Sequence, residues 1–361
     1  MIADAWTYSI GSDWWWVLLI KAVIAVGFLT TAAAYLTYAE RKVAARIQLR
    51  YGPNRVGPFG LLQPAADAIK MLFKENTAPA GRDKLIYVIA PGLAAGAAIL
   101  AFAVIPVSAV QCLNGGPHIG QAGLTCPSGY ALHWDIANLN VGLLFILAIT
   151  SIGVYSIFLG GWAANSKYSL LGGLRSSAQI ISYEMAVSFA LIGPVILAGS
   201  LNLEQMVSSQ QHLWYVFLQP LAFVIYFIAA LAETNRAPFD LPEAETELVA
   251  GYHTEYGSMR FGLYFLGEYV NMVVVSSIAT SLFLGGWLSP LPTSWIIIGQ
   301  IPGVVWYLIK VVALLFVMMW VRWTLPRLRY DRLMSLGWKL LLPLGLINIM
   351  VTGTIVALRA G

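Results

Sequence analysis

Carboxylates are the side chains of this sequence best suited to chemistry, because many of them are gathered in one stretch. The chain contains only 17 acidic residues, and seven of them lie between positions 233 and 268. They are Glu233, Asp240, Glu243, Glu245, Glu247, Glu255 and Glu268. A carboxylate beside apolar segments is energetically costly, so this grouping favours a proton-handling function. The alternative is a solvated loop in which the acids after Pro242 stabilise the start of a helix.

The elements that must position these carboxylates are membrane helices. The chain is 59% hydrophobic and only 11% charged, whereas soluble domains contain about 25% charged residues. We therefore predict an all-α membrane protein with one membrane domain, residues 1–361, and no cleavable signal peptide. Eight apolar runs reach the roughly 20 residues that cross a bilayer. They cover residues 14–38, 86–110, 139–159, 179–198, 213–231, 261–284, 303–320 and 340–356.

The basic residues predict the orientation of these helices. Lys and Arg fall in the loops at about 39–85, 160–178, 232–260 and 321–339, whereas the opposite loops have none apart from Arg359 in the tail. This asymmetry places the four basic loops inside and both termini outside. The net charge of +4 therefore reflects topology and not a nucleic-acid partner. Lys21 and Lys310 lie within helices, and we expect both to reach outward to water rather than to form buried ion pairs.

Two further features concern the inner side of the membrane. Apolar and polar residues alternate with helical spacing over Gly60–Glu75, which predicts an amphipathic helix lying in the interface. Glu184 and Glu268 each follow an inner arginine by about eight residues, which places both roughly 12 Å inside the membrane. This matching depth favours a shared polar layer, although two unrelated, locally paired carboxylates would give the same pattern.

The sequence provides no evident redox or metal centre. It lacks a glycine-rich nucleotide loop and a Cys-x-x-Cys pair, and its two cysteines are too few for an iron–sulfur cluster. Among the histidines, His253 is alone on the inner side. Cys112 and Cys126 share an outer loop, where they could form a disulfide; a zinc site with His118 and His133 is the less favoured alternative.

Long segments of the chain resemble the H subunit of the proton-pumping NADH:quinone oxidoreductases, the respiratory complex I family. The most specific is Arg46-Ile-Gln-Leu-Arg-Tyr-Gly-Pro-Asn-Arg-Val-Gly in the first inner loop. The others are residues 40–42, 61–64, 67–70, 160–172, 175–184, the acidic stretch from Glu233, 326–334 and 338–339. The resemblance covers nearly the whole chain but not the N-terminal dozen residues or the cysteine-bearing loop.

This resemblance implies a membrane subunit that forms part of a quinone chamber and couples quinone reduction to proton translocation. The implied chamber residues are Glu40, Arg41, Arg50, Asp67, Arg236, Glu243, Glu245, Glu247 and Arg322. The implied proton path is Glu184, Glu233, Asp240, Glu255 and Glu268. Quinone, either ubiquinone or menaquinone, would be the substrate, and no cofactor would be bound covalently, since flavin and iron–sulfur clusters would belong to partner subunits.

The resemblance also implies partners and a location. The partners would be the quinone-reducing hydrophilic subunits, small membrane subunits and the lipid bilayer, and the location a bacterial inner membrane with both termini periplasmic. Two alternatives have sequence-level counterarguments. A proton-coupled secondary transporter often shows internal inverted repeats, which are not evident here. The related subunit of a membrane-bound hydrogenase is disfavoured by the quinone-passage motifs of the first inner loop.

Overall fold

The computed structural model describes residues 15–109, 111–112, 131–240, 251–290 and 301–360, and within them the protein consists of helices joined by turns and loops, with one short strand pair. The helices are α2 (Trp15–Ile47), α3 (Gln63–Phe73), α4 (Lys84–Phe102), α5 (Gly142–Ala163), α6 (Lys167–Ala198), α7 (Leu203–Ser208), α8 (Tyr215–Leu218), α9 (Pro220–Glu233), α11 (Ser258–Phe283), α13 (Gly303–Thr324), α14 (Tyr330–Leu336) and α15 (Leu342–Ala360). Short 3-10 turns cover Pro58–Gly60 and Gly251–His253, and a π-helical turn covers Gly337–Leu341. Strands β1 (Gln111–Cys112) and β2 (Ala131–Leu132) pair antiparallel.

The predicted all-α membrane fold is confirmed. Within the described residues, seven helices are long and apolar enough to cross a membrane: Trp15–Ile47, Lys84–Phe102, Gly142–Ala163, Lys167–Ala198, Ser258–Phe283, Gly303–Thr324 and Tyr330–Arg359. The eighth predicted run, residues 213–231, is represented by the shorter apolar helix α9. This run is interrupted because α8 ends at Leu218 and Pro220 opens α9, and proline has no backbone N–H with which to continue the earlier helix.

Several helices extend beyond the predicted apolar runs into the inner loops. Helix α2 continues to Ile47 and α6 begins at Lys167, so the predicted loops at 39–85 and 160–178 are partly helical. Hydropathy marks the thickness of the hydrocarbon layer, whereas a helix can continue past it with polar side chains. The amphipathic helix predicted over Gly60–Glu75 is α3, which is shorter, and its apolar Leu72 and Phe73 are exposed.

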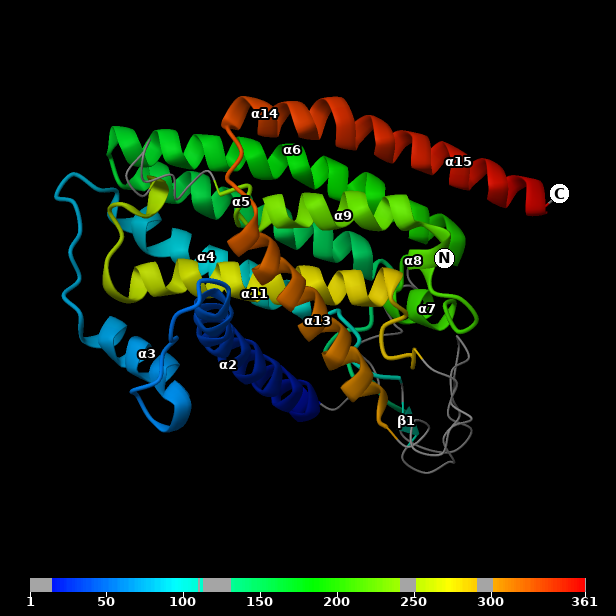
Figure 1. Cartoon of the computed structure of the whole chain (residues 1–361), viewed down its shortest axis with the longest axis horizontal. Helices are drawn as coiled ribbons and strands as arrows, with labels where there is room; N and C mark the ends of the chain where they lie inside the picture. The colour runs from blue at the N-terminus through cyan, green and yellow to red at the C-terminus, as the bar shows by residue number, and fades with distance from the viewer. Residues whose placement is uncertain (1–14, 110, 113–130, 241–250, 291–300, 361) are drawn as a thin grey trace.

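The core consists of helices packed side by side (Figure 1). Helix α4 packs on α5 and α11, α6 packs on α5, α9 and α15, and α2 and α13 both pack against α11. Close approaches require glycine at two positions. A Cβ on Gly267 of α11 would lie 3.0 Å from the Ala94 carbonyl carbon of α4, and one on Gly172 of α6 would lie 2.6 Å from the Cα of Gly251. Both contacts bring the acidic stretch against the helical core.

The break between α8 and α9 is filled by polar side chains. Gln219, which lies at the break, donates a hydrogen bond of 2.7 Å from Nε2 to the hydroxyl of Thr352 and accepts one of 2.9 Å on Oε1 from Asn348. Both partners belong to α15. Interhelical hydrogen bonds of this kind satisfy polar groups that water cannot reach in a membrane.

The predicted outward reach of Lys310 is wrong. Its side chain is buried and Nζ donates hydrogen bonds to the backbone carbonyls of Leu284 (2.7 Å), Gly286 (2.9 Å) and Leu288 (2.6 Å), while it also lies 4.2 Å from the ring centroid of Trp214. These carbonyls follow the C-terminal end of α11, where the helix dipole favours a cation. Lys310 therefore joins α13 to α11. Lys21, by contrast, is half-buried and interacts electrostatically with Asp135 of an outer loop.

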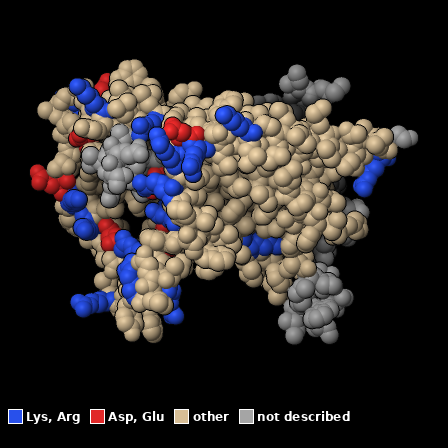
Figure 2. Space-filling model, turned by 45° about the horizontal axis from the view of Figure 1, so that its top comes forward, with Lys and Arg blue, Asp and Glu red and all other residues tan. Residues whose placement is uncertain are grey.

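Charged side chains gather at one end of the molecule. Figure 2 shows most of the visible Lys and Arg side chains at the left end, together with the visible acidic ones, whereas much of the remaining surface is uncharged.

The two cysteines are far in sequence from the acidic residues 233–268. Cys112 lies in β1, and Cys126 and His118 fall outside the described residues. The disulfide therefore stays a prediction.

Candidate functional site

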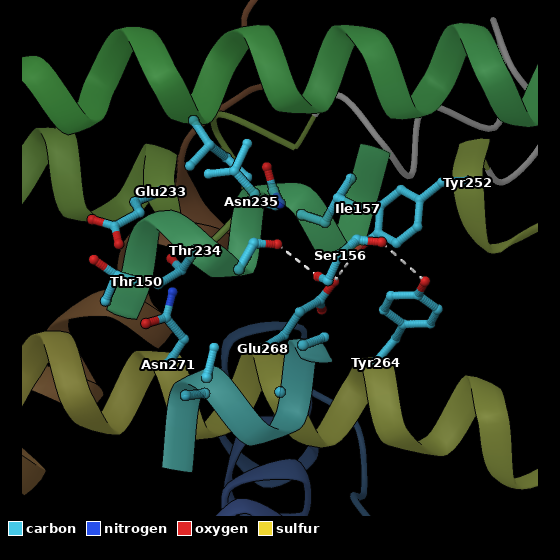
Figure 3. Close-up of a pocket in the computed structure, with 17 residues that line it drawn as sticks. Thr150, Ser156, Ile157, Glu233, Thr234, Asn235, Tyr252, Tyr264, Glu268 and Asn271 are labelled. Atoms are coloured by element: carbon cyan, nitrogen blue, oxygen red, sulfur yellow. Dashed lines mark hydrogen bonds between the residues drawn. The ribbon is translucent and has the colours of Figure 1, made fainter. Parts of the chain in front are cut away.

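A small cavity that several polar side chains line lies in the helical core where the acidic stretch meets α4, α5 and α11 (Figure 3). Its volume is about 70 Å³, which is room for a few waters, since one water needs roughly 10–15 Å³ measured in this way. Its polar lining consists of Thr150, Ser156, Glu233, Thr234, Asn235, Tyr252, Tyr264, Glu268 and Asn271. Alanine, glycine and branched aliphatic residues make up the remainder. The cavity therefore brings polar side chains to a small, partly open space within an apolar core.

Two predicted carboxylates line this cavity from different elements. Glu233 is the last residue of α9, and Glu268 lies on α11. Figure 3 shows Glu233 beside Thr150 and Glu268 near the middle of the cluster. The hydroxyl of Tyr252 donates a hydrogen bond of 3.2 Å to Oε1 of Glu268. Residues that are 35 positions apart in sequence therefore face the same small cavity.

A third predicted carboxylate, Glu184 of α6, lies next to the cavity. Its Oε1 accepts a hydrogen bond from the hydroxyl of Ser151, and Ser151 follows the cavity-lining Thr150 on α5. Glu184 also interacts electrostatically with Glu233. Three carboxylates that were predicted to share one function are therefore gathered around one site.

A buried ion cluster adjoins the cavity and is centred on Glu40 of α2. Glu40 is 4% exposed, and its carboxylate accepts hydrogen bonds from Nη1 of Arg236 at 3.3 Å and from the hydroxyl of Tyr269 at 2.6 Å. Arg322 of α13 donates a further hydrogen bond to Oε1 of Glu40. Three of the predicted chamber residues, Glu40, Arg236 and Arg322, are therefore in direct contact.

Arg236 retains binding capacity within this cluster. It is 4% exposed, its guanidinium lies 4.2 Å from the ring centroid of Tyr269, and Nε and Nη2 make no hydrogen bond to other described residues. Burial lowers the pKa of Arg236, but Tyr269 and Glu40 outweigh this effect and raise the pKa overall, so the guanidinium is charged. Unpaired buried N–H groups are costly, which favours an acceptor such as water or a ligand oxygen at this position.

The loop that carries these residues is fixed by Gln179 of α6. Its Nε2 donates hydrogen bonds to the backbone carbonyls of Ala232 at 2.8 Å and Phe239 at 2.7 Å. Gln179 is fully buried, so water cannot replace these bonds. The two contacts hold both ends of the turn on which Glu233 and Arg236 lie.

Other predicted residues lie away from the cavity. Asp240 is buried and accepts a hydrogen bond of 3.1 Å from Arg327, whereas Glu255 is half-buried and its backbone carbonyl accepts a hydrogen bond from Tyr87. Arg41 and Asp67 form an exposed ion pair at 2.8 Å. An open groove of about 760 Å³ is lined by Arg41, Arg50, Tyr51, Gly52, Pro53, Asn54, Arg55 and Gln63. The predicted Glu243, Glu245 and Glu247 lie outside the described residues.

Sequence reasoning missed the neutral partners of the carboxylates. Tyr269 bonds to Glu40, Tyr252 bonds to Glu268, Ser151 bonds to Glu184, and Asn271 lines the cavity. Tyr269 and Asn271 follow Glu268 closely in sequence, which is the only signal that could have indicated them. Tyrosine and serine are common in apolar helices, so their types alone carry no such information.

Comparison with known proteins identifies the family of this fold. Residues 20–353 match the model of the NADH dehydrogenase family. The chain belongs to the NADH dehydrogenase family. Similar relatives carry the name of the H subunit of NADH-quinone oxidoreductase. The protein from Geobacter metallireducens is 52% identical over 94% of this chain and 97% of its own length, and that from Syntrophobacter fumaroxidans is 52% identical over 93% and 95%. The protein from Protochlamydia amoebophila is 49% identical over 89% and 92%.

Membership in the NADH dehydrogenase family agrees with the resemblance found in the sequence. The matched region contains all the helices that adjoin the cavity, and it contains the ion cluster as well. The family assignment therefore covers the candidate site and not only a peripheral part of the chain.

Proposed function

We propose that this chain is the membrane subunit of a proton-translocating NADH:quinone oxidoreductase, where it forms the membrane part of the quinone chamber. In this proposal it relays quinone reduction to the carboxylates around the cavity. Electrons come from flavin and iron–sulfur clusters on partner subunits, and quinone is the substrate. Support comes from the family membership and from relatives of similar length that are named as the H subunit of this enzyme. The membrane is the bacterial inner membrane, with both termini periplasmic.

The observation that carries this proposal is that the ion cluster and the cavity share two short segments. Glu233 lines the cavity and Arg236, three residues later, bonds to Glu40. Glu268 lines the cavity and its neighbour Tyr269 bonds to the same Glu40. Arg236 and Glu268 also interact electrostatically. We infer that a change of charge or position at the cluster reaches both cavity carboxylates through these two segments.

The size of the cavity supports a role in proton transfer and not in quinone binding. Sites for organic ligands measure about 300–1,000 Å³, and the cavity measures about 70 Å³. Waters between Glu233 and Glu268 fit this space. The groove of about 760 Å³ beside Arg41 and Arg50 is of the size expected for a larger ligand, and it lies among the residues implied for the chamber.

A charge at short range is strong enough to move a proton. A unit charge that appears about 4 Å from a partly buried group changes its energy by about 4 kcal/mol at an effective dielectric constant of about 20. This energy would change the pKa of the group by about three, because a change of one in pKa equals about 1.36 kcal/mol. A negative charge formed during quinone reduction near Arg236 would compete with Glu40 for the guanidinium. The resulting change in field at Glu268 would move a proton.

Replacement of the cavity carboxylates tests this function in the assembled enzyme. We expect Glu233→Gln and Glu184→Gln to lower quinone-linked NADH oxidation and proton pumping in reconstituted vesicles, because neither amide can hold or release a proton. Asp331→Asn is the matched control, since Asp331 pairs with Arg329 on the surface. Oxidation of NADH by a soluble electron acceptor should be unchanged in all three variants. Wild-type quinone reduction and pumping in both glutamine variants would contradict the proposal.

A further inference from the structure

His253 is a buried imidazole that faces the cavity carboxylate Glu268. It ends the 3-10 turn Gly251–His253, is 4% exposed, and its Nε2 lies 3.8 Å from Oε1 of Glu268. This distance is too long for a hydrogen bond. Nε2 makes no hydrogen bond to any other described residue. Because a buried polar atom is rarely left without a partner, the geometry indicates a second state in which Nε2 is bonded.

Aromatic rings fix the imidazole in this orientation. The His253 ring centroid lies 3.9 Å from that of Tyr252, 5.5 Å from that of Phe261 and 5.4 Å from that of Tyr264. Burial lowers the pKa of His253 to about 3, so the ring is neutral at physiological pH. A neutral imidazole carries one N–H and one nitrogen lone pair; when the proton is on Nδ1, the lone pair is on Nε2 and can accept a hydrogen bond.

The hydrogen bond from Tyr252 determines which state of Glu268 can use that lone pair. The Tyr252 hydroxyl already donates to Oε1 of Glu268, the oxygen nearest to His253. If Oε1 carries a proton, the hydroxyl of Tyr252 donates to Oε1 and Oε1–H can donate to Nε2 of His253, so both hydrogen bonds point the same way. If Glu268 is ionised, it has no proton to donate to Nε2. Hydrogen bonds aligned in one direction strengthen one another, so this chain favours the protonated carboxyl.

The charged groups near Glu268 act through charge and do not fix the orientation of its carboxyl. Arg236 interacts with it as a positive charge and so favours the ionised form. Glu233 lines the same cavity from α9, and an ionised Glu233 would disfavour ionised Glu268 in any orientation of that side chain. The imidazole would act through a directed hydrogen bond, which needs only a small approach of Oε1 from its present distance of 3.8 Å to Nε2.

We propose that His253 is a positioning residue that accepts a hydrogen bond from the protonated carboxyl of Glu268 and holds this carboxyl in its proton-loaded orientation. The proposal rests on the proposed function, in which Glu268 takes up and releases a proton. His253 does not carry the proton itself. A neutral side chain with an acceptor at the same place should therefore replace it.

Three variants of the assembled enzyme test this role. His253→Gln places an amide oxygen near the position of Nε2, whereas His253→Phe fills the space without an acceptor. Phe261→Leu is the control for packing, because Phe261 contacts the same imidazole ring but has no polar atom. The readouts are the pH profile of coupled quinone reduction and the infrared C=O band of the protonated carboxyl, assigned by its loss in Glu268→Gln.

The expected results differ among these variants. One hydrogen bond changes an equilibrium about tenfold. In His253→Phe, the pH at which half of the C=O band of protonated Glu268 is lost, called the midpoint, should therefore fall by about one pH unit. His253→Gln and Phe261→Leu should keep the midpoint. An unchanged midpoint in His253→Phe, or an equal shift in His253→Gln or Phe261→Leu, would overturn the proposal. Wild-type coupled turnover in Glu268→Gln would instead contradict the role of Glu268 on which the proposal rests.

Discussion

Removal of the Glu40 charge should strongly destabilise the protein, because it leaves a buried guanidinium without its counterion. In Glu40→Gln, Arg236 would stay charged at 4% exposure, since the pKa of arginine is too high for neutralisation. Breaking a buried ion pair by removing one partner costs about 3–5 kcal/mol. The hydroxyl of Tyr269 and the guanidinium of Arg322 also lose a charged acceptor. We therefore expect a loss of about 4 kcal/mol in the free energy of unfolding.

Denaturant-induced unfolding of the detergent-solubilised protein, followed by tryptophan fluorescence, measures this loss. Asp67→Asn is the control, because its ion pair with Arg41 has side chains that are 31% and 52% exposed. Exposed pairs contribute about 0–1 kcal/mol. The double variant Glu40→Gln/Arg236→Met should recover part of the loss, because it removes the unpaired charge. A cost for Glu40→Gln no greater than that of Asp67→Asn would refute the reasoning.

Three further predictions concern other buried polar groups. Burial raises the pKa of Asp135 from 3.8 to about 6. The stability that protonated Asp135 contributes is therefore complete below pH 4 and is lost as the pH rises through 6. In thermal unfolding, Asp135→Asn should stabilise the protein by roughly 2–3 kcal/mol at pH 7.5 and by almost nothing at pH 4. Lys310→Met should cost about 2–4 kcal/mol, because three carbonyls lose their donor; an unaltered unfolding midpoint would contradict this. Gln179→Leu should cost about 2–3 kcal/mol and increase proteolysis near residue 236, since both clamping bonds are lost.

Hydropathy predicted the fold class but not the ends of the helices. The apolar runs correspond to helices because a bilayer requires internally bonded backbone. Polar extensions such as residues 39–47 of α2 and 167–178 of α6 carry no hydropathy signal, and the break at Gln219 is visible only through the following proline. Lys310 was misjudged because its acceptors are backbone carbonyls some 22–26 positions earlier, which no residue type reveals.

The candidate site was predicted in part. The rarity of acids in apolar sequence indicated Glu184, Glu233 and Glu268, and the structure gathers them around one cavity. The same argument could not separate them from Asp240, whose partner Arg327 lies 87 positions away. Sequence also could not indicate that Glu40 of α2 meets Arg236, because that contact joins residues 196 positions apart. Long-range pairing is determined by helix packing, which a single sequence does not specify.

The adjacency of Glu268 and Tyr269 on α11 has a mechanical consequence. Successive side chains on an α-helix point about 100° apart, so these two neighbours reach different surroundings, the cavity and Glu40. Any twist of α11 about its long axis must turn both side chains together. A rotation of α11 that separates the Tyr269 hydroxyl from Glu40 therefore also reorients the Glu268 carboxyl. The helix backbone thus couples the two side chains mechanically.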